Sequence, residues 1–190
     1  MTLSNKLTSL PTLEEFLQLP ETKPASEYID GKIYQKPMPQ GKHSRLQTCL
    51  STAINQVGES KKLALALTEL RCTFAGKSIV PDIAVFEWEN IPLDENGQIA
   101  NKFEIPPDWI IEILSPEQSA SKVIRKITFS IKNGTKLGYF IDADDLSITV
   151  FQPSQLPEVK EGVDIIPVLP ALQDWKLTVE DVFACLSFSK

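Results

Sequence analysis

The segment of residues 108–115, DWIIEILS, limits the fold more than any other part of the sequence, because it is an almost continuous apolar run. Such runs are typical of strands buried on both faces of a sheet. Pro116 ends the run, and residues 117–133 follow with apolar side chains at three- and four-residue spacing, which predicts a helix ending before Gly134. Residues 136–142, KLGYFID, predict a further strand. A strand, a helix and a strand in this order predict a right-handed crossover between parallel strands, and therefore an α/β fold.

The remaining elements extend this unit into a mixed sheet. Thr12 and Glu15 have the spacing of a capping box at the start of a short helix. Asp30-Gly31 predicts a hairpin turn within residues 27–35, and residues 41–58 carry the apolar stripe of a long helix. Other patterns predict strands at 63–67, 70–74, 79–86 and 146–152, a loop at 87–107, and a last short helix capped by Thr178.

The length of 190 residues suits one domain spanning residues 1–190, and no internal repeat divides it. No apolar run is long enough to cross a membrane, and the N-terminal residues lack the pattern of a signal peptide. Cys49, Cys72 and Cys185 are far apart and lie among apolar neighbours, which predicts small buried side chains rather than disulfides or metal ligands. We therefore expect a reducing, cytoplasmic location and no membrane association.

Two carboxylates, Asp82 and Glu112, lie within the apolar segments 79–86 and 109–114. An unpaired ionised carboxylate is costly to bury, so each acid requires an exposed strand end, a lysine partner or a metal ion. Two such acids on neighbouring strands would repel one another unless a divalent cation lay between them. Oxygen ligands and the lack of a Cys/His cluster favour Mg²⁺ or Mn²⁺ over zinc, with Asp82 and Glu112 as the metal ligands.

The net charge of the chain argues against nucleic-acid binding, whereas the local distribution of its basic residues is compatible with it. The net charge is −6, whereas proteins that bind nucleic acid without sequence preference are usually basic. A local basic cluster nevertheless follows the strand that carries Glu112. It could contact phosphates or form an ordinary solvated helix face. Its members are Lys122, Arg125, Lys126, Lys132 and Lys136.

Several of these segments together resemble one known family. They are VPDIAVF at residues 80–86, WIIEILSP at 109–116 and GTKLGYFID at 134–142, joined by EYIDGK at 27–32 and by His43. The set is similar to the Uma-type endonuclease family of the PD-(D/E)XK nuclease superfamily, and the similarity covers roughly residues 10–152. The resemblance implies a restriction-endonuclease-like fold, with a mixed central sheet flanked by helices, and a metal-dependent nuclease site.

The resemblance also implies roles for individual residues. Asp82 and Glu112 would be the catalytic and metal-binding acids, while Leu114 stands where the superfamily often has a lysine. Lys122 or Lys126, which share a face of the predicted helix, would then supply the lysine. Lys122 is the first choice because it is nearer the end of the Glu112 strand.

Glu27 and His43 are further candidates for the site. Glu27 could be an ordinary hairpin charge or a further acid at the metal. His43, the single histidine of the chain, could make a polar contact at a helix end or take part in catalysis.

These observations predict a Mg²⁺- or Mn²⁺-dependent endonuclease that hydrolyses phosphodiester bonds of nucleic acid, most simply DNA. The alternative from another class is a non-catalytic nuclease-fold module that binds nucleic acid or protein, which the missing lysine at position 114 and the acidic charge favour. A sugar- or ester-hydrolysing enzyme with two carboxylates is a weaker hypothesis, because no sugar-stacking aromatic groove is evident. A homodimer is left open by the sequence.

Overall fold

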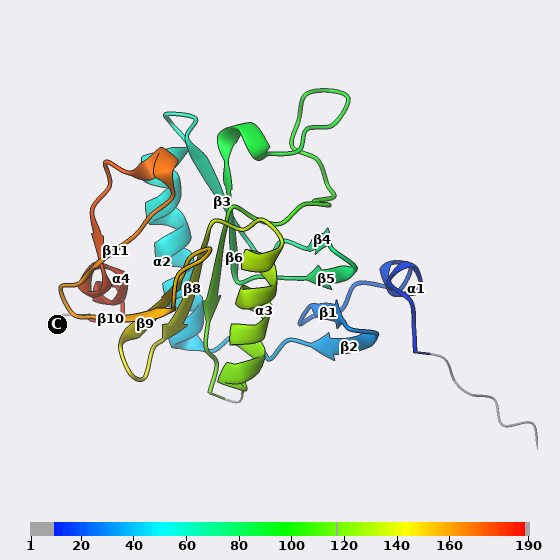
Figure 1. The fold of residues 1–190 in the computed structure, drawn as a ribbon, viewed down its shortest axis with the longest axis horizontal. Helices are drawn as coiled ribbons and strands as arrows, with labels where there is room; N and C mark the ends of the chain where they lie inside the picture. The colour runs from blue at the N-terminus through cyan, green and yellow to red at the C-terminus, as the bar shows by residue number, and fades with distance from the viewer. Residues whose placement is uncertain (1–9, 117, 189–190) are drawn as a thin grey trace, which may run out of the picture.

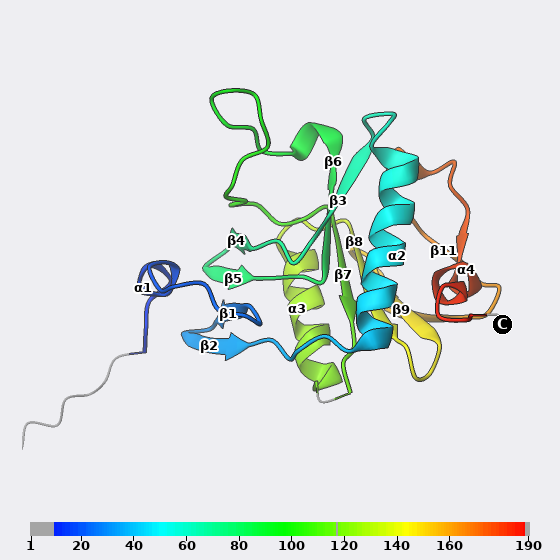
Figure 2. The same ribbon diagram turned by 180° about the vertical axis from the view of Figure 1, so that it is seen from behind.

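The computed structural model describes residues 10–116 and 118–188. Its central sheet has six strands, and the helices α2 and α3 cover opposite faces of that sheet (Figures 1 and 2). The strand order is β10 (Glu158–Glu161), β9 (Ser147–Phe151), β8 (Leu137–Asp142), β7 (Trp109–Ile113), β6 (Ile83–Glu87) and β3 (Ala64–Thr68). The helices are α2 (Gly41–Gly58) and α3 (Ala120–Lys132). β7 and β8 are parallel and the other neighbouring pairs are antiparallel, which confirms the predicted α/β fold with a mixed sheet.

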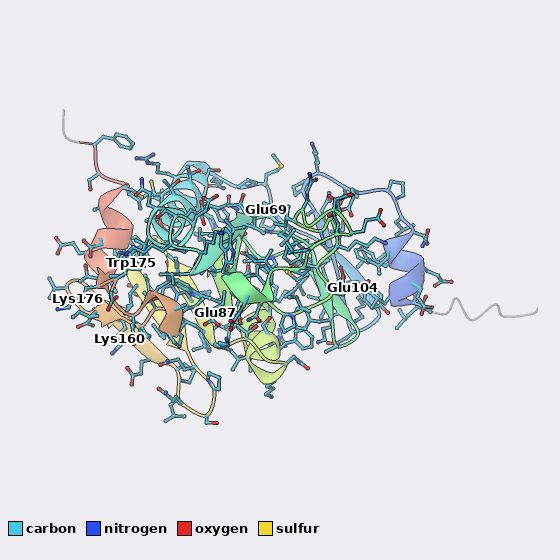
Figure 3. All side chains as sticks on the ribbon, turned by 90° about the horizontal axis from the view of Figure 1, so that it is seen from above. Glu69, Glu87, Glu104, Lys160, Trp175 and Lys176 are labelled. Carbon is cyan, nitrogen blue, oxygen red and sulfur yellow. The ribbon has the colours of Figure 1, made fainter. Side chains whose placement is uncertain are left out.

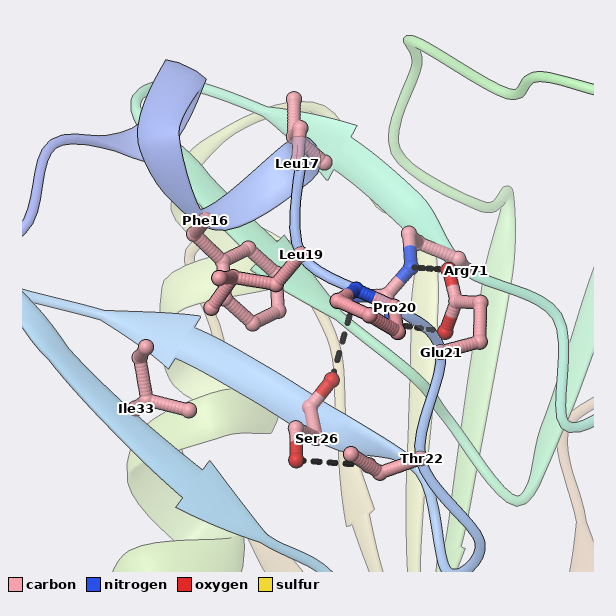
Figure 4. A pocket seen from close by; sticks show the side chains of 9 residues that line it. All are labelled: Phe16, Leu17, Leu19, Pro20, Glu21, Thr22, Ser26, Ile33 and Arg71. Atoms are coloured by element: carbon pink, nitrogen blue, oxygen red, sulfur yellow. Dashed lines mark hydrogen bonds and ion pairs between the residues drawn. The ribbon is translucent and has the colours of Figure 1, made fainter.

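A second sheet of four strands lies beside the central one, and the N-terminal helix packs against it (Figure 1). Its strand order is β2 (Lys32–Gln35), β1 (Ser26–Ile29), β5 (Lys77–Ile79) and β4 (Cys72–Phe74), and the helix is α1 (Leu13–Leu17). The predicted hairpin is confirmed, with Asp30 and Gly31 both at positive φ in the turn. The capping box of Thr12 and Glu15 is also formed. Figure 4 shows Arg71 joining the segment after α1 to β1, through Glu21 and the Ser26 carbonyl.

The segment 79–86, predicted as one strand, is divided in the structure, and that part of the prediction is wrong. β5 ends at Ile79 and β6 begins at Ile83, so Val80, Pro81 and Asp82 connect strands of two different sheets. Pro81 has no N–H to donate to a neighbouring strand, which explains why the ladder is interrupted there. Asp82 consequently lies at the junction of the two sheets rather than inside a strand.

Elsewhere the boundaries differ modestly from the predictions. α3 begins at Ala120 rather than at 117, which lies outside the described residues, and the loop 87–107 contains the short 3₁₀ helix Trp88–Asn90. The predicted last helix is confirmed with Thr178 as its cap. Elements after β9 that the sequence did not predict are β10, β11 (Ile165–Ile166), the 3₁₀ helix Pro170–Leu172 and β12 (Leu177–Thr178), followed by the helix α4 (Val179–Ala184).

The three cysteines are free thiols, as predicted. Cys72 is buried, whereas Cys49 and Cys185 are half-buried, so the expected burial is complete only for the first of them. Over the part of the chain that the structure describes, no helix is long and apolar enough to cross a bilayer.

Two apolar cores fix the position of the central sheet between its helices. On one face Leu46, Leu50 and Ile54 of α2 pack on the sheet, and on the other face Val123 and Ile127 of α3 do so. Because side chains alternate along a strand, β7 contributes to both cores. Ile111 and Ile113 belong to the α2 core and Ile110 to the α3 core, which places Glu112 on the α3 side.

The close approach of α3 to β8 leads to a stability prediction. A Cβ atom at Gly138 would lie 2.5 Å from Cγ2 of Ile127, so this strand position requires glycine. We expect Gly138→Ala to destabilise the protein by about 1–3 kcal/mol through overpacking. The melting temperature should fall by about 2–4 °C for each kcal/mol, and thermal unfolding followed by circular dichroism measures this. Gly41→Ala is the control, because a Cβ there meets nothing within 4 Å. Equal melting temperatures for Gly138→Ala and the parent would contradict the prediction.

Candidate active site

Asp82 and Glu112, the two acids predicted to hold a metal, occupy neighbouring positions at one end of β6. β6 and β7 are antiparallel, with Ile83 opposite Ile111. Asp82 immediately precedes Ile83 and Glu112 immediately follows Ile111. The Asp82 Oδ2 atom accepts a hydrogen bond of 2.7 Å from the backbone N–H of Ile113. Asp82 is therefore anchored beside the strand position that Glu112 occupies.

The Asp82 carboxylate is buried but is surrounded by groups that favour its ionised form. The Lys36 Nζ atom lies 2.8 Å from Oδ1, and the His43 Nε2 atom lies 3.1 Å from Oδ2. Burial by itself would raise the pKa of Asp82, but Lys36, His43 and Lys126 together outweigh it and hold that pKa well below its usual value. Asp82 is therefore an anion throughout the neutral pH range.

The Glu112 carboxylate, in contrast, lies in surroundings that favour its protonated form. Its side chain is 1% exposed and its Oε2 atom lies 2.9 Å from the Lys126 Nζ atom, while its Oε1 atom has no hydrogen-bond partner among the residues that the structure describes. Burial is the main cause that raises the pKa of Glu112 to about 8, and the negative charge of Asp82 adds to it, although Lys126 acts against the increase. Near neutral pH the Glu112 carboxyl can therefore gain or lose a proton.

Glu27 reaches the same place from β1. Its Oε1 atom accepts hydrogen bonds of 2.8 Å from the backbone N–H of Val80 and 2.8 Å from the Lys126 Nζ atom. The Lys126 ammonium thus bridges Glu27 and Glu112 in a buried position. Burial lowers the pKa of Lys126, but Glu112 and Glu27 outweigh that effect and raise it, so the side chain is charged.

The structure places Lys126, rather than Lys122, in contact with the acids. The Lys122 side chain is exposed, and its Nζ atom lies 5.3 Å from the centre of the Tyr34 ring. Lys126 lies one turn further along α3 and points inward next to the buried Ile127. The preference for Lys122, based on its distance along the chain from Glu112, is therefore not supported by the geometry.

His43 lies in the first turns of α2 and is buried, and its expected polar contact near a helix end is formed, whereas its part in catalysis stays a prediction. Its polar contact near a helix end is made to Asp82 itself, so it belongs to this cluster. To donate a hydrogen bond to the carboxylate, the Nε2 atom must carry a ring proton. The buried Nδ1 atom has no hydrogen-bond partner within the described part of the chain.

Three polar residues of this cluster were not predicted from the sequence. The Lys36 Nζ atom contacts both Asp82 and Glu69, at 2.8 Å and 2.9 Å. The Gln47 side chain donates hydrogen bonds to the Asp82 carbonyl and to Glu69. Figure 3 shows Glu69 on the side of the molecule where α2 lies. The KPMP sequence that begins at Lys36 gives no periodic pattern, so no local signal pointed to this lysine.

The oxygen atoms of this cluster fit a small hard cation. Asp82 is ionised, and Glu112 offers a buried oxygen that has no hydrogen-bond partner in the described part of the chain. Within residues 10–116 and 118–188 there is no group of three or more His, Cys, Asp or Glu side chains arranged as a metal site. Two carboxylates nevertheless suffice for Mg²⁺, which commonly keeps several waters and binds protein through one or two carboxylates.

Comparison with known proteins agrees with this arrangement. Residues 13–180 match the model of the Uma2 family, which is described as "Putative restriction endonuclease". The chain belongs to the Uma2 family. The fold also matches a solved structure described as "a putative nuclease belonging to DUF820 from Anabaena variabilis ATCC 29413", with 50% sequence identity and a TM-score of 0.91. That match covers 93% of this chain and 99% of the other. Among curated proteins no sequence match is found.

Membership of the Uma2 family confirms the resemblance inferred from the sequence, and with it the restriction-endonuclease-like fold. The descriptions of the family and of the solved structure both support a nuclease as the function class. Position 114 holds leucine instead of lysine, but the site has an ammonium, because the Nζ atom of Lys126 in α3 lies 2.9 Å from Glu112. In this Uma2 protein a lysine and two acids converge although Glu112 is not followed by a lysine two positions later.

Proposed function

We propose that the chain is a Mg²⁺- or Mn²⁺-dependent endonuclease that hydrolyses phosphodiester bonds of DNA. The observation that supports it best is the Lys126 ammonium, which lies 2.9 Å from Glu112 in a cluster that includes Asp82. Lys126 comes from α3, Glu112 from β7 and Asp82 from the position directly before β6. An ammonium and two carboxylates are the groups that a metal-dependent phosphodiesterase needs, and the description of the Uma2 family supports a nuclease.

Asp82 and Glu112 would hold the cation. When bound, it would supply an acidified water and a Lewis acid at the scissile phosphate. Asp82 is suited to this role because it is kept ionised, and Glu112 because its buried Oε1 atom has no hydrogen-bond partner within the described residues. Cation binding requires the ionised form of Glu112, so the affinity for the metal should rise with pH up to about 8, the pKa of this carboxyl.

The neighbouring residues have positioning or charge-stabilising roles in this proposal. Lys126 would stabilise negative charge that develops on the phosphate, or orient the attacking water. Glu27 holds Lys126 through a hydrogen bond of 2.8 Å, and His43 holds Asp82 at 3.1 Å. In this proposal Glu27 acts through Lys126 and His43 acts through Asp82, so both are positioning residues.

The substrate would approach along α3. Lys122, Arg125 and Lys132 are exposed on this helix, and basic side chains of this kind contact phosphates of a nucleic-acid backbone. Lys136 of the same sequence cluster instead binds Glu87 and Asp108. With a net charge of −6, affinity for DNA should be modest and should fall steeply with salt.

A non-catalytic nucleic-acid-binding or protein-binding module is the second candidate. The observation that favours it is that the Lys126 ammonium is already bound to two carboxylates, Glu27 and Glu112. In such a module the buried ion pairs would serve the fold alone. The two candidates differ in cleavage, because a module would bind DNA without producing new ends.

Cleavage of supercoiled plasmid DNA tests the proposal. With Mg²⁺ or Mn²⁺ the parent protein should produce nicked and linear DNA, and a chelator should stop the reaction. Asp82→Asn should be inactive although folded, because it removes the ionised metal ligand while preserving the shape of the side chain. Circular dichroism of both proteins controls for folding. Equal cleavage by parent and variant would place the activity outside this site. A parent that cuts neither DNA nor RNA with either ion would support the module.

A further inference from the structure

Lys36 is a second buried lysine at the candidate site. It follows β2 directly, and its side chain is 7% exposed although it carries a charge. Its backbone N–H donates a hydrogen bond of 2.9 Å to the Ala25 carbonyl, and Pro37 follows it, so the main chain is held in place. The amine is therefore presented to the cluster from a fixed backbone.

The Lys36 ammonium has more acceptors than hydrogen atoms. Its Nζ atom lies 2.8 Å from Asp82 Oδ1, 3.0 Å and 2.9 Å from the two Glu69 carboxylate oxygens, and 3.0 Å from the Val80 carbonyl oxygen. A lysine ammonium carries three hydrogens. It can therefore give up one acceptor and still satisfy its hydrogens with the others.

The two oxygen atoms of the Asp82 carboxylate have different partners. Its Oδ2 atom already accepts hydrogen bonds from Ile113 and His43, whereas Oδ1 contacts Lys36. A cation that binds Asp82 would use the oxygen that Lys36 occupies. Two positive charges at such short distances repel strongly in a buried place. The ammonium and a metal ion therefore compete for the same carboxylate oxygen.

We propose that Lys36 is a positioning residue that neutralises Asp82 before the metal binds, competes with the metal for Oδ1, and then remains bound to Glu69. The inference rests on the proposed metal site. Glu69 suits the second role because it is 42% exposed, which lowers the cost of its charge, and because Gln47 holds its Oε1 atom at 3.1 Å. Removal of Lys36 should strengthen metal binding, whereas removal of the Glu69 charge should weaken it.

Isothermal titration of each purified protein with Mn²⁺ tests this proposal. We expect Lys36→Met to bind Mn²⁺ about tenfold more tightly than the parent, within the 5- to 150-fold range that is common for coupled binding events. Glu69→Gln should bind it several-fold more weakly, because the ammonium then has Asp82 as its remaining carboxylate. In the double variant the effect of Glu69→Gln should disappear, because Glu69 acts through Lys36. Fully additive effects, or unchanged affinity in Lys36→Met, would overturn the proposal.

Two controls separate this mechanism from a general change of charge. Lys136→Met also removes an ammonium that bridges two carboxylates, Glu87 and Asp108, and should leave the Mn²⁺ affinity unchanged. Glu21→Gln removes an exposed carboxylate that pairs with Arg71 and should also have no effect. If Lys36→Met does not fold, the Mn²⁺ affinities of Glu69→Gln and Glu21→Gln test the proposal instead. Equal affinities of these two variants would overturn it.

The same titration distinguishes failure of this inference from failure of the proposed function. If Mn²⁺ binds the parent and not Glu112→Gln, the metal site stands, and the affinity of Lys36→Met then tests Lys36 alone. If neither the parent nor Lys36→Met binds Mn²⁺, both proposals are wrong. Binding to Lys36→Met but not to the parent would support the competition directly.

Discussion

Replacing Lys126 with methionine is expected to lower the rate of DNA cleavage by about 10²–10³-fold, the usual effect of losing one donor that stabilises transition-state charge. The variant should also be less stable. Lys126 bridges Glu27 and Glu112 in the interior, and removing one partner of a buried ion pair typically costs about 3–5 kcal/mol. Single-turnover cleavage at a temperature well below the melting point of the variant separates the two effects.

Lys122→Met is the matched control for this experiment. Lys122 lies on the same helix, one turn away, but is exposed and contacts the Tyr34 ring. Its loss should change the cleavage rate little. The slope of log affinity for DNA against log salt concentration should decrease by about one, the contribution of one phosphate contact. If Lys122→Met lost as much activity as Lys126→Met, or if Lys126→Met cut as fast as the parent, the assignment of the lysine would be wrong.

Position on α3, which the apolar spacing of Val123 and Ile127 already indicates in part, separates these two lysines. Successive residues of a helix are rotated by about 100°. Val123, Ile127 and Ser130 are the buried residues of α3 besides Lys126, and they define its inward direction. On a helical projection Lys126 lies about 65° from that direction and Lys122 about 105° from it. Distance along the chain from Glu112 was a weaker guide than position on the helix.

The break between β5 and β6 also had a signal in the sequence, since Pro81 cannot take part in a central ladder. Lys36 and Glu69 had none. They reach Asp82 from 46 and 13 positions away in the sequence, through turns whose geometry depends on how the two sheets pack. The apolar periodicity predicted the sheet and both covering helices because burial determines those elements. The polar contacts at the sheet junction depend on tertiary packing, which no local pattern encodes.

Glu112→Gln is expected to stabilise the metal-free protein at alkaline pH. The folded pKa of Glu112 is raised from 4.5 to about 8 by burial, so between these values the folded state keeps a proton that the unfolded state has released. The free energy of unfolding of the parent should therefore fall as pH rises through this window, by up to about 1.4 kcal/mol per pH unit from this group. Glutamine cannot ionise, so the variant lacks this contribution.

Urea denaturation at intervals from pH 5 to pH 9, with a chelator present, measures the difference. Parent and variant should be closest in stability near pH 5, and the variant should be the more stable by several kcal/mol near pH 9. Adding Mn²⁺ at pH 9 should reverse the order, because the cation binds the ionised carboxylate of the parent and stabilises only its folded state. Parallel pH profiles would show that Glu112 is ionised in the folded protein throughout. The reversal, in contrast, would mean that the charge which destabilises the free protein is the charge that the metal requires.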